Sequence, residues 1–229
     1  MVNIKEAIRD ADMVLVGIGE AFRVKLDMEE FSDDMQGVLK KRACLQSCKG
    51  NQISQAYDSL SELLIDKNYF IVTLCNDDLI LKSSLKQDKI VAPCGTYKKL
   101  QCENGCAQTL LHFDDEIDLE SQICEECGGK LCFNLFETPH YNEAGYLPMW
   151  EKYTKWIQGS LNKKILVLEL GVGFAYPSVI RWPFEKIAFF NHKASFYRVH
   201  DSLYQISDEL HEKGIAIQEN PIQFLLEQV

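Results

Sequence analysis

Four cysteines in the middle of the chain have the spacing of a metal site. Cys102 and Cys106 form a C-x3-C pair, and Cys124 and Cys127 form a C-x2-C pair further along. Each pair can present two thiolates from one tight turn, and four thiolates complete the tetrahedral shell of a structural zinc ion. Two alternatives stay open from the residues alone: the pairs can be disulfides, or buried apolar cysteines with no shared role. The spacing favours zinc.

The composition indicates the kind of protein that carries these cysteines. The chain has 229 residues, 46% of them hydrophobic and 25% charged, as in ordinary globular proteins. No apolar run approaches the roughly 18 residues that a membrane span needs, and the first dozen residues lack the apolar core of a secretion signal. Nine cysteines without such a signal indicate a reducing compartment. We therefore expect a cytoplasmic protein with no membrane partner.

The charge of the chain argues against nucleic-acid binding. The formal net charge is −10, and basic residues cluster only in the short runs 40–42 and 98–99. Binding to a phosphate backbone needs a basic stripe on the surface. We expect no nucleic-acid partner, and a protein partner or substrate instead.

Apolar strands alternate with helices along the chain, and this order predicts the fold. We expect strands at 13–16, 69–74, 88–92, 164–170 and 187–190, and helices at 3–10, 55–67, around 150–157, 202–213 and 220–229. This pattern is typical of an α/β protein with a doubly wound, parallel, Rossmann-like sheet. We expect a nucleotide-binding domain at 1–95 and 135–229, with a small inserted zinc-binding module at 96–134. The polar stretch 27–52, with an acidic patch, is left unassigned.

Residues with possible chemical roles follow the expected strands. Ligands of such sheets bind beyond the carboxyl ends of the strands. The candidates at these ends are Gly17, Gly19, Asn76, Asp77, Cys94, Gly171, Gly173 and Asn191. The expected site therefore draws on several strand ends.

Each of these candidates also has a purely structural interpretation. Glycines after a strand can let backbone N–H groups approach a phosphate, or they can simply turn the chain. Asn76 and Asp77 can hydrogen-bond a ribose, or they can cap the next helical turn. A thiolate at Cys94 can be a nucleophile if its pKa is lowered, but no basic residue lies beside it in the sequence. A passive cysteine is the favoured interpretation.

Several of these segments resemble motifs of the sirtuin family. The stretch from Asp10 to Gly19 resembles the first sirtuin strand with its Gly-Ala-Gly loop, and 69–77 resembles the stretch that ends Val-Thr-x-Asn-x-Asp. The run 124–131 is similar to the second zinc knuckle, Cys-x-x-Cys-Gly-Gly-x-Leu. The run 168–177 resembles Glu-Leu-Gly-Val-Gly of the macrodomain-associated sirtuin branch. Asn191 matches an Ile-Asn pair of the family. The likeness covers essentially the whole chain.

The resemblance implies an NAD-dependent enzyme with a structural zinc ion. It implies transfer of ADP-ribose to a protein or, less favoured, removal of an acyl group from one. Asp77 and Asn191 would position the ribose, and Asn76 would lie at the nicotinamide. The glycines of the two loops would face the NAD molecule, with Gly171 and Gly173 on its adenosine side.

The sequence departs from the family pattern at residues with chemical roles. Cys94 stands where the family has a general-base histidine, and Cys75 falls on the nicotinamide-pocket asparagine. Glu20 and Ala21 occupy the loop that should hold the pyrophosphate, where a carboxylate would repel a phosphate. Three hypotheses therefore stay open: an atypical sirtuin-like transferase or deacylase, a catalytically silent sirtuin fold that binds or scaffolds, and a thiol enzyme built on Cys94.

Overall fold

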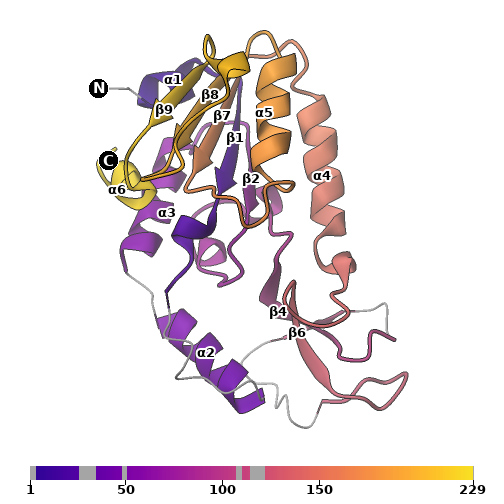
Figure 1. Ribbon diagram of the computed structural model, residues 1–229. Coiled ribbons are helices and arrows are strands. Elements are labelled where there is room, and N and C mark those ends of the chain that lie inside the picture. The colour runs from indigo at the N-terminus through magenta and orange to yellow at the C-terminus, as the bar shows by residue number, and fades with distance from the viewer. Residues whose placement is uncertain (1–3, 26–34, 48–50, 107–109, 114–121, 229) are drawn as a thin grey trace.

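Six parallel strands form the central sheet of the protein, described here from a computed structural model (Figure 1). The structure describes residues 4–25, 35–47, 51–106, 110–113 and 122–228. In order across the sheet, the strands are β3 (Ile90–Val91), β2 (Tyr69–Thr73), β1 (Met13–Ile18), β7 (Ile165–Leu170), β8 (Ser195–Val199) and β9 (Gly214–Ile217). Counted along the chain, this is the 3-2-1-4-5-6 order of the Rossmann dinucleotide-binding fold. The predicted α/β fold class is confirmed.

Helices cover both faces of this sheet (Figure 1). Helices α1 (Ile4–Asp10), α3 (Gln52–Leu63) and α6 (Pro221–Leu226) pack on one face, and α4 (Leu147–Gln158) and α5 (Arg181–Phe190) pack on the other. Successive strand residues point to opposite faces, so Val14 and Val16 join the first core while Met13 and Leu15 join the second. Because both faces are buried, β1, β2 and β7 are nearly continuous apolar runs, which made these three strands recognisable in the sequence.

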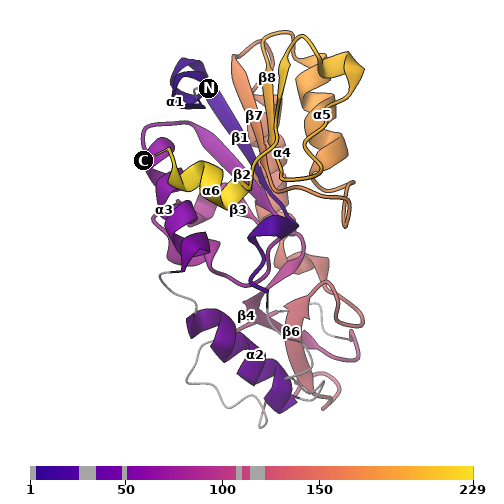
Figure 2. The ribbon, with the colours of Figure 1, turned by 60° about the vertical axis from the view of Figure 1, so that its left-hand side comes forward.

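A smaller antiparallel sheet lies beyond the carboxyl ends of the parallel strands (Figure 2). Its central strand β4 (Gly95–Cys102) pairs with β5 (Leu111–His112) and with β6 (Leu131–Leu135). Helix α2 (Met35–Ser47) packs against it, where Leu45 joins Tyr97 and Phe133 in a separate hydrophobic cluster. The predicted domain boundaries stay a prediction.

Two expected elements in the last part of the chain are wrong. Residues 187–190 are the end of helix α5, whose side chains Phe184 and Ala188 are buried at helical spacing. A short apolar run does not distinguish a buried strand from a buried helix, which explains the error. The strand of this region is β8. The expected helix at 202–213 is also wrong, because this range holds a 3-10 turn at Asp208–Leu210 and leads into strand β9.

The polar stretch 27–52 contains helix α2, which the sequence did not predict. Residues 26–34 and 48–50, which include the acidic patch and Cys48, lie outside the described residues. Helix α3 begins earlier than expected, because Asn51 caps it: its Oδ1 accepts the N–H of Ser54 at 2.9 Å. Among the helices of the described ranges, none is long and apolar enough to cross a bilayer.

Candidate nucleotide and zinc sites

The loops after β1 and β7 meet at one edge of the parallel sheet, where the strand order reverses. Both strands end on the side of the small sheet (Figures 1 and 2). Gly17 and Gly19 lie at the end of β1, and Gly171 and Gly173 follow β7. A Rossmann sheet binds its dinucleotide in the crevice at this reversal. The structure therefore brings together the four predicted glycines.

Three of these glycines allow the protein to pack tightly against itself. A Cβ atom on Gly19 would lie 2.1 Å from Gly171 O, and Gly171 itself has a φ of +64°. The N–H of Gly19 donates to Leu170 O at 2.9 Å, so a hydrogen bond also joins the two loops. A Cβ on Gly17 would lie 2.6 Å from the Ile180 side chain. These close approaches favour the packing interpretation of the glycines over direct phosphate contact.

The Gly19→Ala variant is expected to be strongly destabilised. Its Cβ would overlap the backbone of Gly171, which cannot rotate away as a side chain can. Overpacking typically costs about 1–3 kcal/mol of the free energy of unfolding, and a clash with backbone belongs at the upper end. Urea unfolding measures the loss. Gly159→Ala is the control, because Gly159 has an ordinary helical φ of −69°. Equal midpoints for the two variants would contradict the contact between the loops.

Glu20, which follows β1, places its carboxylate on the loop that follows β7. Its Oε2 accepts the N–H of Gly173 at 2.8 Å, and its Oε1 accepts the N–H of Ala175 at 2.9 Å. A Cβ on Gly173 would lie only 3.3 Å from Oε2, so the glycine leaves room for the carboxylate. Backbone N–H groups that point together in this way form an anion-binding nest. A ligand phosphate at this loop would therefore have to compete with the Glu20 carboxylate for these two N–H groups.

A network of buried charged side chains holds the loop after β7 against the loop after β8. Arg198 on β8 donates from Nε to Glu169 on β7 at 2.6 Å, and both side chains are almost completely buried. Arg181, at the start of α5, donates to Val172 O at 3.0 Å and stacks on Phe174, 4.2 Å from the ring centroid. Both arginines also donate to backbone carbonyls of the loop after β8. The sequence reasoning missed this network, although Glu169 and Arg198, two charged residues inside buried strands, are a signal that could have found it.

The four predicted zinc ligands form one cluster. The Sγ atom of Cys102 lies 3.3 Å from that of Cys106 and 3.6 Å from that of Cys127, and those of Cys106 and Cys124 are 3.4 Å apart. All four sulfur atoms lie within 4.8 Å of one another. Tetrahedral zinc with bonds of about 2.3 Å needs sulfur atoms about 3.8 Å apart, so the cluster fits. The four thiolates would hold the ion as a closed structural site.

The tight turns at the two cysteine pairs each contain a glycine in the left-handed conformation. Gly105 and Gly128 have φ values of +66° and +67°, which glycine adopts without strain. Cys127 Sγ also accepts the N–H of Gly129 at 3.4 Å. All eight cysteines of the described ranges are free, including these four, so no disulfide joins any of them. The disulfide alternative is thereby removed.

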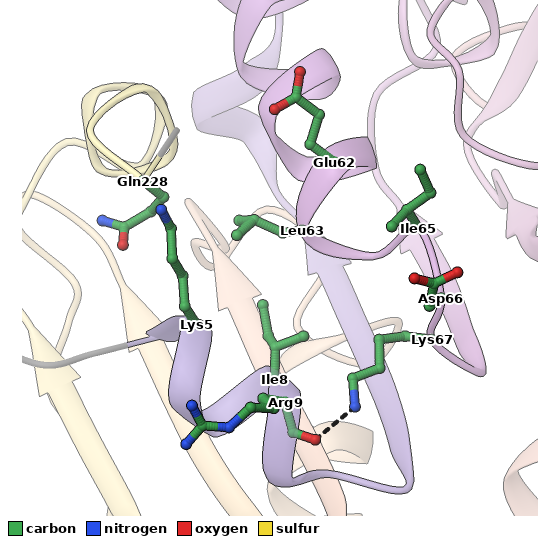
Figure 3. Close-up of a pocket in the computed structure, with 9 residues that line it drawn as sticks. All are labelled: Lys5, Ile8, Arg9, Glu62, Leu63, Ile65, Asp66, Lys67 and Gln228. Atoms are coloured by element: carbon green, nitrogen blue, oxygen red, sulfur yellow. Dashed lines mark hydrogen bonds between the residues drawn. The ribbon is translucent and has the colours of Figure 1, made fainter.

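A separate cavity lies at the opposite edge of the sheet, near the amino ends of β1 and β2 (Figure 3). It measures about 590 Å³ and contains none of the predicted site residues. Lys67 lies on its wall and donates to Arg9 O at 2.7 Å and to Ala11 O at 3.0 Å. This cation caps the end of helix α1. The side chains that line the cavity are Lys5, Ile8, Arg9, Glu62, Leu63, Ile65, Asp66, Lys67 and Gln228.

Aromatic side chains join the edge of the parallel sheet to the small sheet. The ring of Phe136, after β6, lies 5.1 Å from that of Tyr176 and 5.7 Å from that of Tyr141. The Tyr141 hydroxyl donates to Pro93 O at 2.9 Å, and Phe136 N donates to Cys94 O at 3.0 Å. These contacts fix the segment around Cys94 between the two sheets.

Comparison with known proteins gives two relatives. No family model matches the chain. A probable bifunctional ADP-ribose hydrolase/ADP-ribosyltransferase of Fusarium oxysporum f. sp. cubense is 28% identical over 137 residues, or 52% of this chain. The matched part spans 23% of the length of that relative. A protein ADP-ribosyltransferase of Staphylococcus aureus is 22% identical over an alignment of 261 residues, which covers 95% of this chain and 83% of the relative.

Solved structures resemble the chain over its whole length. A sirtuin from work on sirtuin substrate affinity matches with a TM-score of 0.62 at 14% identity, covering 100% of this chain and 98% of that one. A Sir2 structure with a p53 peptide and NAD+ matches with a TM-score of 0.60 at 12% identity, covering 98% and 95%. The chain has a sirtuin fold. The predicted resemblance to sirtuins is confirmed at this level.

In this sirtuin fold, Asp77 has one oxygen committed to the protein and one that is not. Its Oδ1 accepts the N–H of Leu79 at 3.1 Å, which is the turn-capping role. Its buried Oδ2 has no well-formed hydrogen bond among the described residues, although the backbone of Val24 lies close enough to the carboxyl to oppose a rise of its pKa. Burial raises the pKa of this carboxyl. Asn76 is half-buried beside it, and Cys75 is fully buried with Sγ 3.5 Å from Gly19 O.

Cys94 is a buried thiol where the sirtuin resemblance implies a histidine. It is 3% exposed, and burial raises its pKa to about 11, although the charge of Arg23 opposes this shift. Arg23 itself donates to Leu74 O at 3.0 Å and lies 5.9 Å from the Tyr176 ring. A thiol with this pKa keeps its proton at neutral pH, which favours the passive interpretation of Cys94.

Asn191 does not lie with the other predicted site residues. It ends helix α5, and its Nδ2 donates to Ser160 O at 3.0 Å, in the loop that leads into the amino end of β7. Its placement at the carboxyl end of a strand is wrong, because the strand was assigned to 187–190. The structure instead places His200 at the carboxyl end of β8, a residue that the sequence reasoning missed. Recognition of Ser195–Val199 as a strand would have identified His200 as a residue at a strand end.

Proposed function

We propose that this protein is an atypical sirtuin-type enzyme that transfers ADP-ribose from NAD to a protein. The observation that carries the proposal is the meeting of the β1 and β7 loops with Asp77 at one edge of a Rossmann-ordered sheet. Both relatives carry ADP-ribosyltransferase in their names, and one of them aligns along 95% of the chain. Sirtuin neighbours were solved with peptides, which supports a protein as the acceptor.

The reaction needs one bond exchange at the NAD ribose. The glycosidic bond to nicotinamide breaks, and the same carbon forms a bond to an acceptor side chain, which gives up its proton. We infer that the buried Oδ2 of Asp77 binds the ribose or the nicotinamide end of NAD, with Asn76 beside it. The loop at Gly171 and Gly173 would lie near the adenosine side. The small module would bind zinc at 96–134 as a structural unit.

Deacylation is the less favoured activity. The family route needs a base to remove a proton from a ribose hydroxyl, and the loss of a general base typically costs about 10²–10⁴ in rate. Cys94 is poorly suited to that role, since burial raises the pKa of its thiol. No other base is assigned to this step. We also propose a reducing compartment such as the cytoplasm, because four cysteines clustered within 4.8 Å suit zinc-bound thiolates, which such a compartment preserves.

Labelled NAD tests the proposal. Incubation of the purified protein with labelled NAD and a cell extract is expected to label discrete proteins. The Asp77→Asn variant is expected to lower the labelling about 10²-fold, as loss of a preorganised polar contact does. Asp66→Asn is the control, because Asp66 lines the cavity at the opposite edge of the sheet. Absence of labelling with NAD that binds normally would contradict transferase activity.

A second candidate function is a catalytically silent sirtuin fold that binds or scaffolds a protein. The carboxylate of Glu20 on the Gly173–Ala175 loop favours it, since it occupies a place suited to a ligand phosphate. Calorimetric titration distinguishes the two functions. Heat on addition of NAD or ADP-ribose favours the enzyme, and no heat at millimolar ligand leaves the scaffold.

A further inference from the structure

The contact between Glu20 and the loop after β7 has the geometry of a bound anion. Both carboxylate oxygens are used, one on the N–H of Gly173 and one on the N–H of Ala175. The acceptor residue and the two donors are more than 150 positions apart in the chain, so this is not a local turn. A carboxylate held by two backbone N–H groups takes up the same donors that a phosphate would use.

Positive charge supports an anion at this place. Arg181 stacks on Phe174, the residue between the two donors, and its charge interacts with those of Glu169 and Glu185 and more weakly with that of Glu20. Its guanidinium is fixed by hydrogen bonds to backbone carbonyls, so it stays beneath the loop whether or not Glu20 is present. The loop therefore offers two N–H donors and a nearby fixed cation, which is the donor set of a phosphate site.

We propose that Glu20 is an internal substitute for a ligand phosphate and thereby sets which ligands the sheet edge accepts. While its carboxylate lies on Gly173 and Ala175, a phosphate group must displace it before binding there. A ligand without a phosphate at this point meets no such competition. The identity of the natural ligand rests on the proposed function, whereas the anion site itself does not.

Substitution of Glu20 is expected to open the anion site. If the carboxylate occupies the donors for about nine-tenths of the time or more, its removal raises the affinity of a competing anion at least about tenfold. Inorganic pyrophosphate, ADP-ribose and adenosine are titrated by calorimetry into the wild-type, Glu20→Ala and Glu20→Gln proteins at one ionic strength. The Ala variant is expected to gain affinity for the first two probes and none for adenosine.

Glu137→Gln is the matched control for net charge. Glu137 also lies near this edge, with Oε1 4.0 Å from the Arg23 guanidinium, and no hydrogen bond from Gly173 or Ala175 to Glu137 is present, since both donate to Glu20. It is expected to change pyrophosphate affinity less than about twofold, as a screened surface charge does. Should the Ala variant unfold, the Gln variant, which can keep one of the two hydrogen bonds, carries the test.

The outcomes separate this proposal from the proposed function. Equal pyrophosphate affinity in the wild-type and Glu20 variants, or no binding to any of them, would overturn the role of Glu20. A gain for pyrophosphate without binding of ADP-ribose by any variant would support the anion site and contradict the NAD-dependent function. Tight ADP-ribose binding that the Glu20 substitutions leave unchanged would contradict the role of Glu20 and support the NAD-dependent function. Gains for both probes in the Glu20 variants support both proposals.

Discussion

Purified protein is expected to carry one zinc ion per chain, and removal of that ion is expected to unfold the small sheet. The hydrophobic cluster of this region includes two of the ligand cysteines, Cys102 and Cys124, so the site and its core are one structure. Binding of structural zinc contributes about 10–16 kcal/mol in small zinc domains, and a cluster of this size has little else to replace it. Metal analysis gives the zinc content, and thermal unfolding with and without a chelator gives the loss.

Cys124→Ser and Cys132→Ser form a matched pair for this prediction. Cys124 belongs to the sulfur cluster, whereas Cys132 on β6 is not part of it and donates to Gln101 O at 3.7 Å. The first variant is expected to lose zinc and the order of the small sheet. The second is expected to keep both. Zinc content well below one per chain in the wild-type protein would show that the cluster has another role.

The parallel sheet could be predicted because its strands carry their own signal. The runs at Met13–Ile18, Tyr69–Thr73 and Ile165–Leu170 are almost entirely apolar, with Glu169 as the one charged residue among them, as is typical of strands buried on both faces. Strand β8 carries Arg198 and an exposed Ser195, so its apolar pattern is broken. The neighbouring run at 187–190 was apolar and took its place in the prediction. The pairing of Arg198 with Glu169 became visible only when the strands lay side by side.

The candidate site could be predicted only in part, because its contacts join distant segments. The zinc ligands were found since each knuckle is encoded within a few residues. The packing of Gly19 on Gly171, and the position of Glu20 on Gly173, depend on two loops from opposite ends of the chain. The sequence showed that Glu20 would oppose a phosphate, but not where its carboxylate lies. That position depends on the register of β1 with β7, which no local pattern reports.

The Arg198→Met variant is expected to be among the least stable single variants of the protein. Arg198 is 1% exposed and donates to Glu169, to Glu185 and to Gln205 O. Removal of one partner from a buried ion pair typically costs about 3–5 kcal/mol, because the remaining charge is left without its counter-ion. Urea unfolding measures the loss. Arg9→Met is the control, since Arg9 is 69% exposed in its pair with Asp10 and should change little.

The pH dependence of that loss tests its cause. Burial raises the pKa of Glu169 to about 7 even though Arg198 opposes the shift, so without Arg198 the carboxyl should hold its proton to still higher pH. A carboxyl whose pKa is raised in the folded state stabilises the fold at low pH, and this contribution disappears as pH rises through the raised pKa. The deficit of Arg198→Met should therefore be larger at about pH 9 than at about pH 5. In the double variant with Glu169→Leu, the fully buried carboxyl is removed and only the partly exposed Glu185 remains beside position 198, so both the deficit and its pH dependence should shrink. A deficit independent of pH would instead indicate lost packing as the cause.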